Sequence, residues 1–93
     1  MMCSGEFLEE KVQEFCARNN QDEGYIWRII NNIHTKDYGR NIMWEKQEYE
    51  KENNLGDIQM SQQFAKENLV HRAIAILKGL DECVKNGWTL EIN

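Results

Sequence analysis

The stretch SQQFAKENLVHRAIAILKGLDECVKNG, residues 61–87, decides the fold that this sequence predicts. Six of its apolar residues follow the spacing i, i+3, i+4, i+7, i+10 and i+14: Val70, Ala73, Ile74, Leu77, Leu80 and Val84. This spacing stacks side chains on one side of an α-helix. Leu69, Ile76 and Cys83 widen the apolar arc to roughly half the circumference, beyond the stripe of about 100° that a surface helix shows. The sequence therefore predicts one long helix that packs against two neighbours.

The last two residues of this stretch predict where the helix ends, and the tail after them predicts a short strand. Asn86 and Gly87 favour termination, because glycine adopts the left-handed conformation at a helix end at the lowest cost. In the tail, apolar and polar residues alternate, with Trp88, Leu90 and Ile92 on one side. Such alternation is typical of an extended strand. The sequence does not indicate which segment would pair with it.

Two further helices are predicted in the first third of the chain. The first runs over about residues 5–18 with Ser4 as its N-cap, and the second over about residues 23–34 with Asp22 as its N-cap. Each has an apolar side: Phe7, Leu8, Val12, Phe15 and Cys16 in the first, and Ile26, Ile29, Ile30 and Ile33 in the second. The glutamates of the first helix share its opposite side, as a solvated face does.

The segment 35–57 carries the weakest pattern. Its Glu, Lys and Gln residues favour a helix over 40–53, and a short strand over 42–45 is the alternative. Asn53, Asn54 and Gly56 indicate a turn, after which Asp57 or Ser61 would cap the long helix.

The predicted fold is mostly α: a small bundle of about four helices with a long C-terminal helix and a short C-terminal extended strand. The 93 residues form one domain, 1–93, because this length has no material for two cores. A domain of this size buries little surface, and oligomerisation is a common remedy. We therefore expect a homo-oligomer.

Charge and cysteine usage exclude several classes of partner. The 11 Lys and Arg residues against 16 Asp and Glu residues give a net charge of −5, which repels nucleic-acid backbones and anionic membrane surfaces. No apolar run of membrane-spanning length and no secretory signal is visible, so we expect a cytoplasmic protein. Cys3, Cys16 and Cys83 are widely spaced without a CxxC pair, which favours reduced, structural thiols.

The sequence contains no recognisable catalytic or metal-binding pattern. His34 falls in the apolar arc of the second helix and His71 on the far side of the long helix from Leu77, so we interpret them as a core-edge and a surface histidine. No nucleophile elbow, phosphate-binding glycine loop, zinc spacing or EF-hand loop is present, and no cofactor is expected. A helix-turn-helix that used residues 40–53 as its reading helix would present an excess of glutamates to DNA.

A second stripe on the long helix is the feature that a monomeric core explains least. It lies roughly opposite Leu77 and comprises Met60, Phe64, His71, Ala75 and Gly79. Either another helix of the same chain covers this side, or the side contacts a second copy or another protein. Trp44 is a second indication of an intermolecular contact. If residues 40–53 are helical, it faces away from the stripe of Tyr38, Ile42 and Tyr49, as an interface anchor would. If that segment is not helical, a buried Trp44 is the alternative.

The sequence thus predicts a noncatalytic, cytoplasmic protein-binding module that associates with itself and inhibits or regulates another protein. Its predicted contact residues are Trp44, Met60, Phe64, His71, Ala75 and Gly79. The alternative is a small-ligand, nucleotide-like binding protein whose pocket, between helices or subunits, is lined by Tyr25, Trp27, Arg28, Tyr38 or Arg40. Aromatic rings and arginines suit planar or phosphate-bearing ligands. A small enzyme is the third hypothesis.

Overall fold

The computed structural model describes residues 4–87 and residue 90. Within them the chain forms five helices: α1 (Gly5–Asn19), α2 (Glu23–Tyr38), α3 (Ile42–Glu52), α4 (Met60–Lys66) and α5 (Val70–Lys85). The predicted helical class is therefore confirmed, with one helix more than expected. The alternative of a strand over 42–45 is wrong, because these residues begin α3.

The first two helices begin at the predicted caps. The Ser4 hydroxyl accepts a hydrogen bond from the Phe7 backbone N–H at 3.1 Å, and the Asp22 carboxylate accepts one from the Tyr25 backbone N–H at 2.9 Å. These side chains satisfy backbone donors that a helix start leaves free. α2 continues four residues beyond the predicted end, to Tyr38, and stops at Gly39.

Every one of these helices is followed by a residue in the left-handed conformation. The residues concerned are Asn20 (φ 52°), Gly39 (φ 72°), Asn54 (φ 53°), Asn68 (φ 60°) and Gly87 (φ 77°). Glycine has no Cβ to clash in this region, and asparagine tolerates it better than other side chains. In a chain without proline, these asparagines and glycines divide the helices.

The predicted long helix is interrupted, and this is the main correction to the sequence analysis. After α4 the backbone N–H of Leu69 donates to the Phe64 carbonyl at 2.8 Å, and that of Asn68 donates to the Ala65 carbonyl at 3.0 Å. This pair of bonds is a Schellman motif, with Asn68 left-handed and with the apolar Leu69 and Phe64 both buried in the core. The chain turns at 67–69 and starts again as α5.

The start of α4 also differs from the prediction. Its N-cap is Gln59, and neither Asp57 nor Ser61 holds that place. The Gln59 backbone N–H donates to the Gln62 side-chain oxygen at 2.8 Å, which fixes the entry into the helix. Asp57 instead accepts a hydrogen bond from Lys46 of α3.

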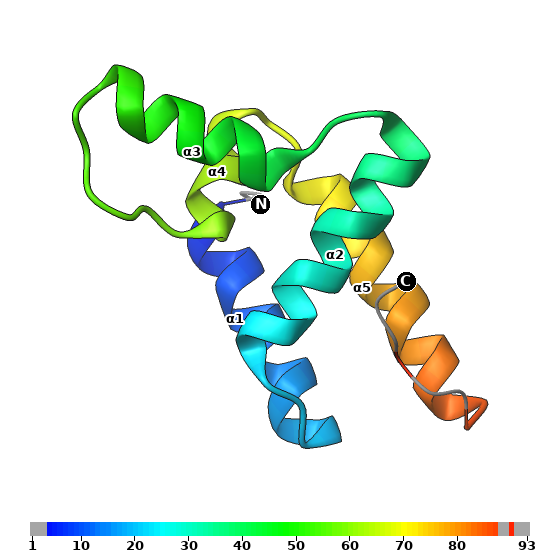
Figure 1. Ribbon diagram of the computed structural model, residues 1–93. Helices are drawn as coiled ribbons and strands as arrows, with labels where there is room; N and C mark the ends of the chain where they lie inside the picture. Colours follow the sequence, from blue (N-terminus) through cyan, green and yellow to red (C-terminus); the bar gives the residue numbers. More distant parts are fainter. Residues whose placement is uncertain (1–3, 88–89, 91–93) are drawn as a thin grey trace.

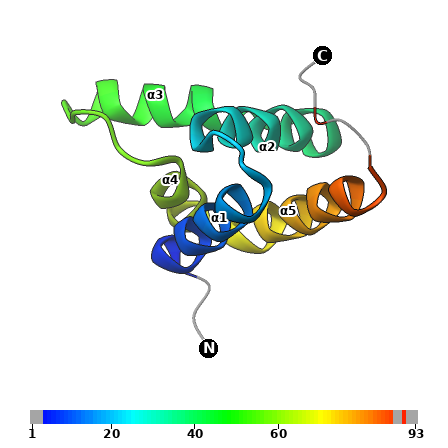
Figure 2. The ribbon, with the colours of Figure 1, turned by 90° about the horizontal axis from the view of Figure 1, so that it is seen from below.

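The helices form two layers around one core. In Figure 2, α2 and α3 follow each other along one layer, and α1, α4 and α5 make the other. α1 packs against both α4 and α5, and Figure 1 shows α4 at the N-terminal end of α1. The buried apolar side chains of all five helices form a single cluster, which includes Phe15, Ile30, Ile42, Phe64 and Leu77. No helix of the described residues is both long and apolar enough to cross a membrane.

The predicted C-terminal strand falls mainly on residues that lie outside the described part of the chain, namely 88–89 and 91–92. Leu90 is described, and its side chain packs against the core. Its backbone carbonyl accepts a hydrogen bond from the Tyr25 hydroxyl at 2.7 Å. Within the described residues no strand is formed.

The left-handed turn at Asn68 generates the first prediction. Asn68→Val should lower the free energy of unfolding by about 1–2 kcal/mol, because a β-branched residue is strained at positive φ. Asn68→Gly is the matched control and should leave stability unchanged or raise it. Chemical denaturation followed by circular dichroism measures both. Equal losses from the two substitutions would contradict the proposed role of the turn.

Candidate interaction site

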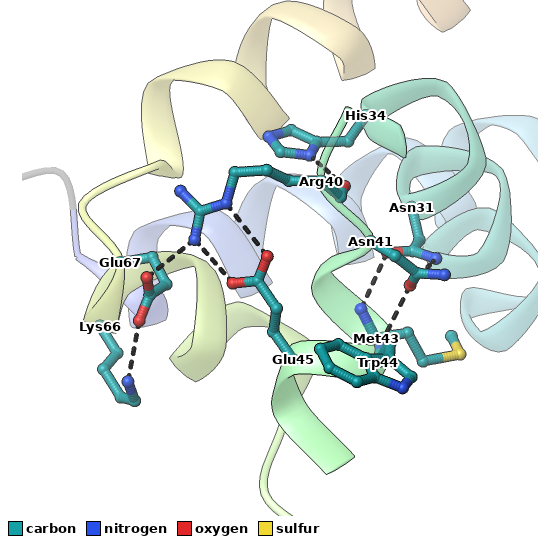
Figure 3. A network of polar contacts seen from close by, with 9 residues as sticks. All are labelled: Asn31, His34, Arg40, Asn41, Met43, Trp44, Glu45, Lys66 and Glu67. Carbon is teal, nitrogen blue, oxygen red and sulfur yellow. Dashed lines mark hydrogen bonds and ion pairs between the residues drawn. The ribbon is translucent and has the colours of Figure 1, made fainter. Parts of the chain in front are cut away.

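Two asparagines fix the N-terminus of α3 and with it the position of Trp44. The Asn41 Oδ1 caps the helix, accepting hydrogen bonds from the Trp44 backbone N–H and from the Asn31 Nδ2, each at 3.0 Å. The Oδ1 of Asn31, a buried residue of α2, accepts the Met43 backbone N–H at 2.9 Å (Figure 3). The helix end that carries Trp44 is therefore positioned directly by α2.

His34 fastens the connection between α2 and α3 from inside the core. Its ring is fully buried, and its Nδ1–H donates to the Arg40 backbone carbonyl at 2.9 Å. The Phe64 ring packs edge-on against it, with centroids 5.5 Å apart. Because a carbonyl only accepts, Nδ1 carries a proton, and Nε2 has no hydrogen-bond partner among the described residues. The sequence predicted His34 at the edge of the core, and the structure buries it completely.

Arg40 joins the start of α3 to the end of α4. Its Nε and Nη2 donate to the two Glu45 oxygens at 3.0 and 2.6 Å, and Nη2 also donates to Glu67 at 2.8 Å (Figure 3). The second Glu67 oxygen accepts a bond from Lys66 at 2.8 Å. Hydrogen bonds from Lys66 and then Arg40 hold the pKa of Glu67 below its ordinary value. The two-point contact with Glu45 fixes orientation as well as distance, so α3 and α4 keep a defined relation.

A buried lysine near the middle of α3 ties the following loop to the helix. The Lys46 Nζ donates to Glu50 at 2.8 Å and to Asp57 at 2.7 Å, and Glu50 also accepts the Ile58 backbone N–H at 2.8 Å. Burial lowers the pKa of Lys46, but the bonds to Asp57 and Glu50 outweigh it, so that the pKa is raised overall. The loop between α3 and α4 is thus tied to α3.

A groove of about 330 Å³ lies between α3 and α4, beside the Arg40 network. It is lined by Trp44, Glu45, Glu48, Tyr49 and Glu52 of α3, by Gln63 and Lys66 of α4, and by Glu67. Trp44 is 58% exposed, the most of the large hydrophobic residues described. The Lys66 Nζ lies 4.2 Å from the centre of the Tyr49 ring, a cation–π contact.

Gln63 contributes an unsatisfied acceptor to this lining. Its side chain is only 1% exposed, and its Oε1 has no hydrogen-bond donor among the described residues. Leaving a buried polar group of this kind unpaired costs about 1–3 kcal/mol. The amide therefore gains from any donor that reaches it through the groove.

The second stripe predicted on the long helix is divided between two helices. Met60 and Phe64 of α4 are buried in the protein's own core. His71, Ala75 and Gly79 of α5 are exposed, and a Cβ added at Gly79 would meet nothing within 4 Å. The α5 residues are thus open to a second molecule, and the α4 residues are not.

The residues predicted for a small-ligand pocket have separate contacts. Trp27 is buried in the core, and the Tyr25 hydroxyl donates to a backbone carbonyl of the C-terminal segment at 2.7 Å. The half-exposed Tyr38 ring lies 4.2 Å from the guanidinium carbon of an arginine on α5. Arg40 belongs to the ion network, and Arg28 is exposed.

Among the described residues, no group of three or more His, Cys, Asp or Glu side chains is placed to hold a metal ion. Burial, and then nearby carboxylates of which Glu23 is first, raise the pKa of the Cys16 thiol to about 11. Little reactive thiolate forms there at neutral pH. Cys83 is partly buried, and Cys3 lies outside the described residues.

Sequence reasoning found Trp44 but missed the rest of the groove. One signal was available: Trp44, Glu48 and Glu52 follow one another at i, i+4 and i+8, which places them along one strip of a helix. Gln63 and Lys66 carried no comparable signal, because their position depends on the unexpected turn after α4.

Neither protein-family models, nor curated proteins, nor solved structures gave a significant match to this chain. The geometry of the α3–α4 groove therefore carries the functional assignment.

The Glu67 ion pairs predict an acid-sensitive fold. Because the pKa of Glu67 is lowered in the fold, the unfolded chain takes up this proton first as the pH falls below the ordinary value of about 4.5. Stability should therefore be present above that pH and decline until the folded carboxyl is protonated as well. Denaturant unfolding at a series of pH values measures the decline.

Glu67→Gln should flatten this part of the pH profile. Glu10→Gln controls for the loss of one carboxylate, because Glu10 is exposed on α1 and forms no ion pair among the described residues. A Glu67→Gln profile as steep as that of the wild type would show that the network does not contribute.

Proposed function

We propose that this protein is a noncatalytic protein-binding module whose principal contact surface is the outer side of α3, centred on Trp44 and the neighbouring groove. The supporting observation is that a 58% exposed indole is carried near the N-terminus of α3, which the buried Asn31 of α2 fixes by a hydrogen bond to the Met43 backbone N–H. Tryptophan is among the residues that contribute most to protein interfaces. A rigid support lowers the entropy lost on binding.

The contacts of α3 explain why Trp44 is available. The inward face of α3 is provided by Ile42 and Lys46, which are buried, so the helix does not need Trp44 for its packing. A large apolar ring exposed beside charged residues adds little to the stability of the fold, and such a surface is typical of a site that binds another protein. Binding at this surface would let the module inhibit or regulate its partner.

Self-association through α5 is a second candidate. Its exposed side presents Ala75 and Gly79, with open space beside Gly79. Small residues four positions apart allow another helix to approach closely, an effect best known from membrane proteins. A homo-oligomer formed in this way would leave the Trp44 surface free.

Replacing Trp44 separates binding from folding. Trp44→Ala should abolish capture of the partner from an extract of the native host and change the free energy of unfolding by only about 0.5 kcal/mol, since the ring is exposed. Leu55→Ala is the matched control, because Leu55 is 46% exposed in the loop after α3. Affinity capture with mass spectrometry and denaturant unfolding are the measurements. An identical set of captured proteins for wild type and Trp44→Ala would refute the proposed surface.

The self-association candidate has its own test. Ala75→Glu should leave the monomer folded, because Ala75 is exposed, but should dissociate an oligomer built on this side of α5, where the carboxylate would be buried without a partner. Ala17→Glu introduces the same change at an exposed position of α1. Light scattering over a range of protein concentrations gives the mass. A wild-type monomer throughout would remove this candidate.

A further inference from the structure

The α3–α4 groove carries a local excess of negative charge. Four carboxylates line it, those of Glu45, Glu48, Glu52 and Glu67, together with the Lys66 ammonium. Adding the neighbouring Arg40 guanidinium, which pairs with two of the four, still leaves two carboxylates in excess. Glu48 has only an exposed contact of 3.4 Å with Lys51, and Glu52 has no ion pair among the described residues. Coulomb attraction here favours a cation.

The chain itself shows how a cation sits in this groove. The Lys66 ammonium lies over the Tyr49 ring at 4.2 Å while it donates to Glu67 at 2.8 Å. A cation is thus held between an aromatic face and a carboxylate. Trp44 and Glu48, one helical turn apart on α3, offer the same pair of groups, and none of the cation–π contacts of the described residues involves the Trp44 ring.

The form of the groove indicates an organic cation with several donors. No metal-binding group is formed by the described residues, whereas the buried Gln63 Oε1 lacks a donor. A guanidinium stacks on aromatic faces and presents five N–H donors in a plane, which suits a ring, carboxylates and an amide oxygen together. The volume of about 330 Å³ is at the lower end for ligand pockets, and it suits one side chain.

A second acidic groove shows that charge alone does not define the site. Between α1 and α4, Glu6, Glu9 and Glu10 line a hollow of about 370 Å³ that contains no aromatic residue. At the start of α4 it is lined by Gln59 and Gln62, and the Gln59 backbone N–H donates to the side-chain oxygen of Gln62. This groove has the negative charge of the first without the exposed ring or the unsatisfied acceptor.

We propose that the α3–α4 groove binds an arginine side chain in a basic segment of the partner protein, with the guanidinium against Trp44, Glu48 and Glu52 and within reach of Gln63. This inference rests on the proposed function and names the chemistry of the partner. The remainder of the basic segment would lie along α3, where the exposed side of Trp44 continues the contact beyond the groove.

The test is a titration of the full chain with N-acetyl-arginine amide, followed by the Trp44 indole N–H and the Gln63 side-chain amide in ¹H–¹⁵N spectra. N-acetyl-citrulline amide, which has nearly the same shape without the charge, is the matched probe. We expect saturable shifts at both groups with the arginine probe, weakened by added salt, and an affinity at least about fivefold lower for the citrulline probe.

Three variants localise the binding. The double substitution Glu48→Gln with Glu52→Gln should weaken the arginine probe roughly fivefold, as expected for two exposed charge pairs. Glu9→Gln with Glu10→Gln, in the other acidic groove, should leave the affinity unchanged. Gln63→Met should weaken binding but not the fold, because it removes a buried acceptor that has no donor among the described residues.

Several results would overturn the proposal. They are the absence of saturable shifts at Trp44, equal affinities for the two probes, or equal losses from the two double variants. Gln63→Met binding like the wild type would remove the role of Gln63. If Trp44→Ala abolishes partner capture and the arginine probe still gives no saturable shift, the protein-binding function stands and the arginine inference fails. The mass of the protein in solution is a further check. If the double variant Glu48→Gln with Glu52→Gln has a lower mass than the wild type, the groove binds a cation from a second copy of this chain, and the proposal of a different partner protein is overturned.

Discussion

The arrangement of this fold depends on the left-handed turn at Asn68. A continuous helix through this point would keep Phe64 and His71 on one face, and Phe64 could not enter the core while α5 ran along α1 and α2. The turn allows both the burial of Phe64 and the packing of α5: α4 buries Met60 and Phe64, and α5 takes a new direction. It also places Glu67, the residue that ends α4, against Arg40. The groove beside α3 exists because the chain stops being helical for three residues.

Around this turn, polar contacts determine where α3 lies. α3 has few buried apolar residues, so hydrophobic burial alone would hold it weakly. Asn31 and Arg40 supply directional contacts to its N-terminal half, to the backbone N–H of Met43 and to Glu45, and Arg40 also donates to Glu67 at the end of α4. Each of these donors and acceptors is partly withdrawn from water, where hydrogen bonds to charged groups are worth most. A helix held in this way can leave its outer side uncommitted.

Local signals in the sequence predicted the helices and caps that depend on nearby side chains. They failed for features that depend on packing between residues far apart in the sequence. The caps at Ser4 and Asp22, the stripe from Val70 to Val84 and the buried His34 follow from side chains within one or two turns. The interruption at Asn68 escaped notice because asparagine enters the left-handed region less often than glycine, and because the apolar residues on both sides kept a helical spacing. The exposure of Trp44 followed once α3 was helical. The pairing of Arg40 with Glu67, 27 residues apart, and the burial of Gln63 follow from packing alone.

The two unsatisfied buried atoms of the described chain differ in a way that bears on function. The Nε2 of His34 lies on a ring that already donates through Nδ1 and packs against Phe64, so the loss at one nitrogen is offset by the contacts of the whole side chain. The amide of Gln63 has no such offset among its described hydrogen bonds, and a methionine of similar shape would fill the same space without an unpaired oxygen. Local rules are broken most often at sites of function. Gln63 lines the same groove as the most exposed aromatic ring and an excess of carboxylates, and a guanidinium bound there, as we propose, would complete the hydrogen bonding of its carbonyl oxygen.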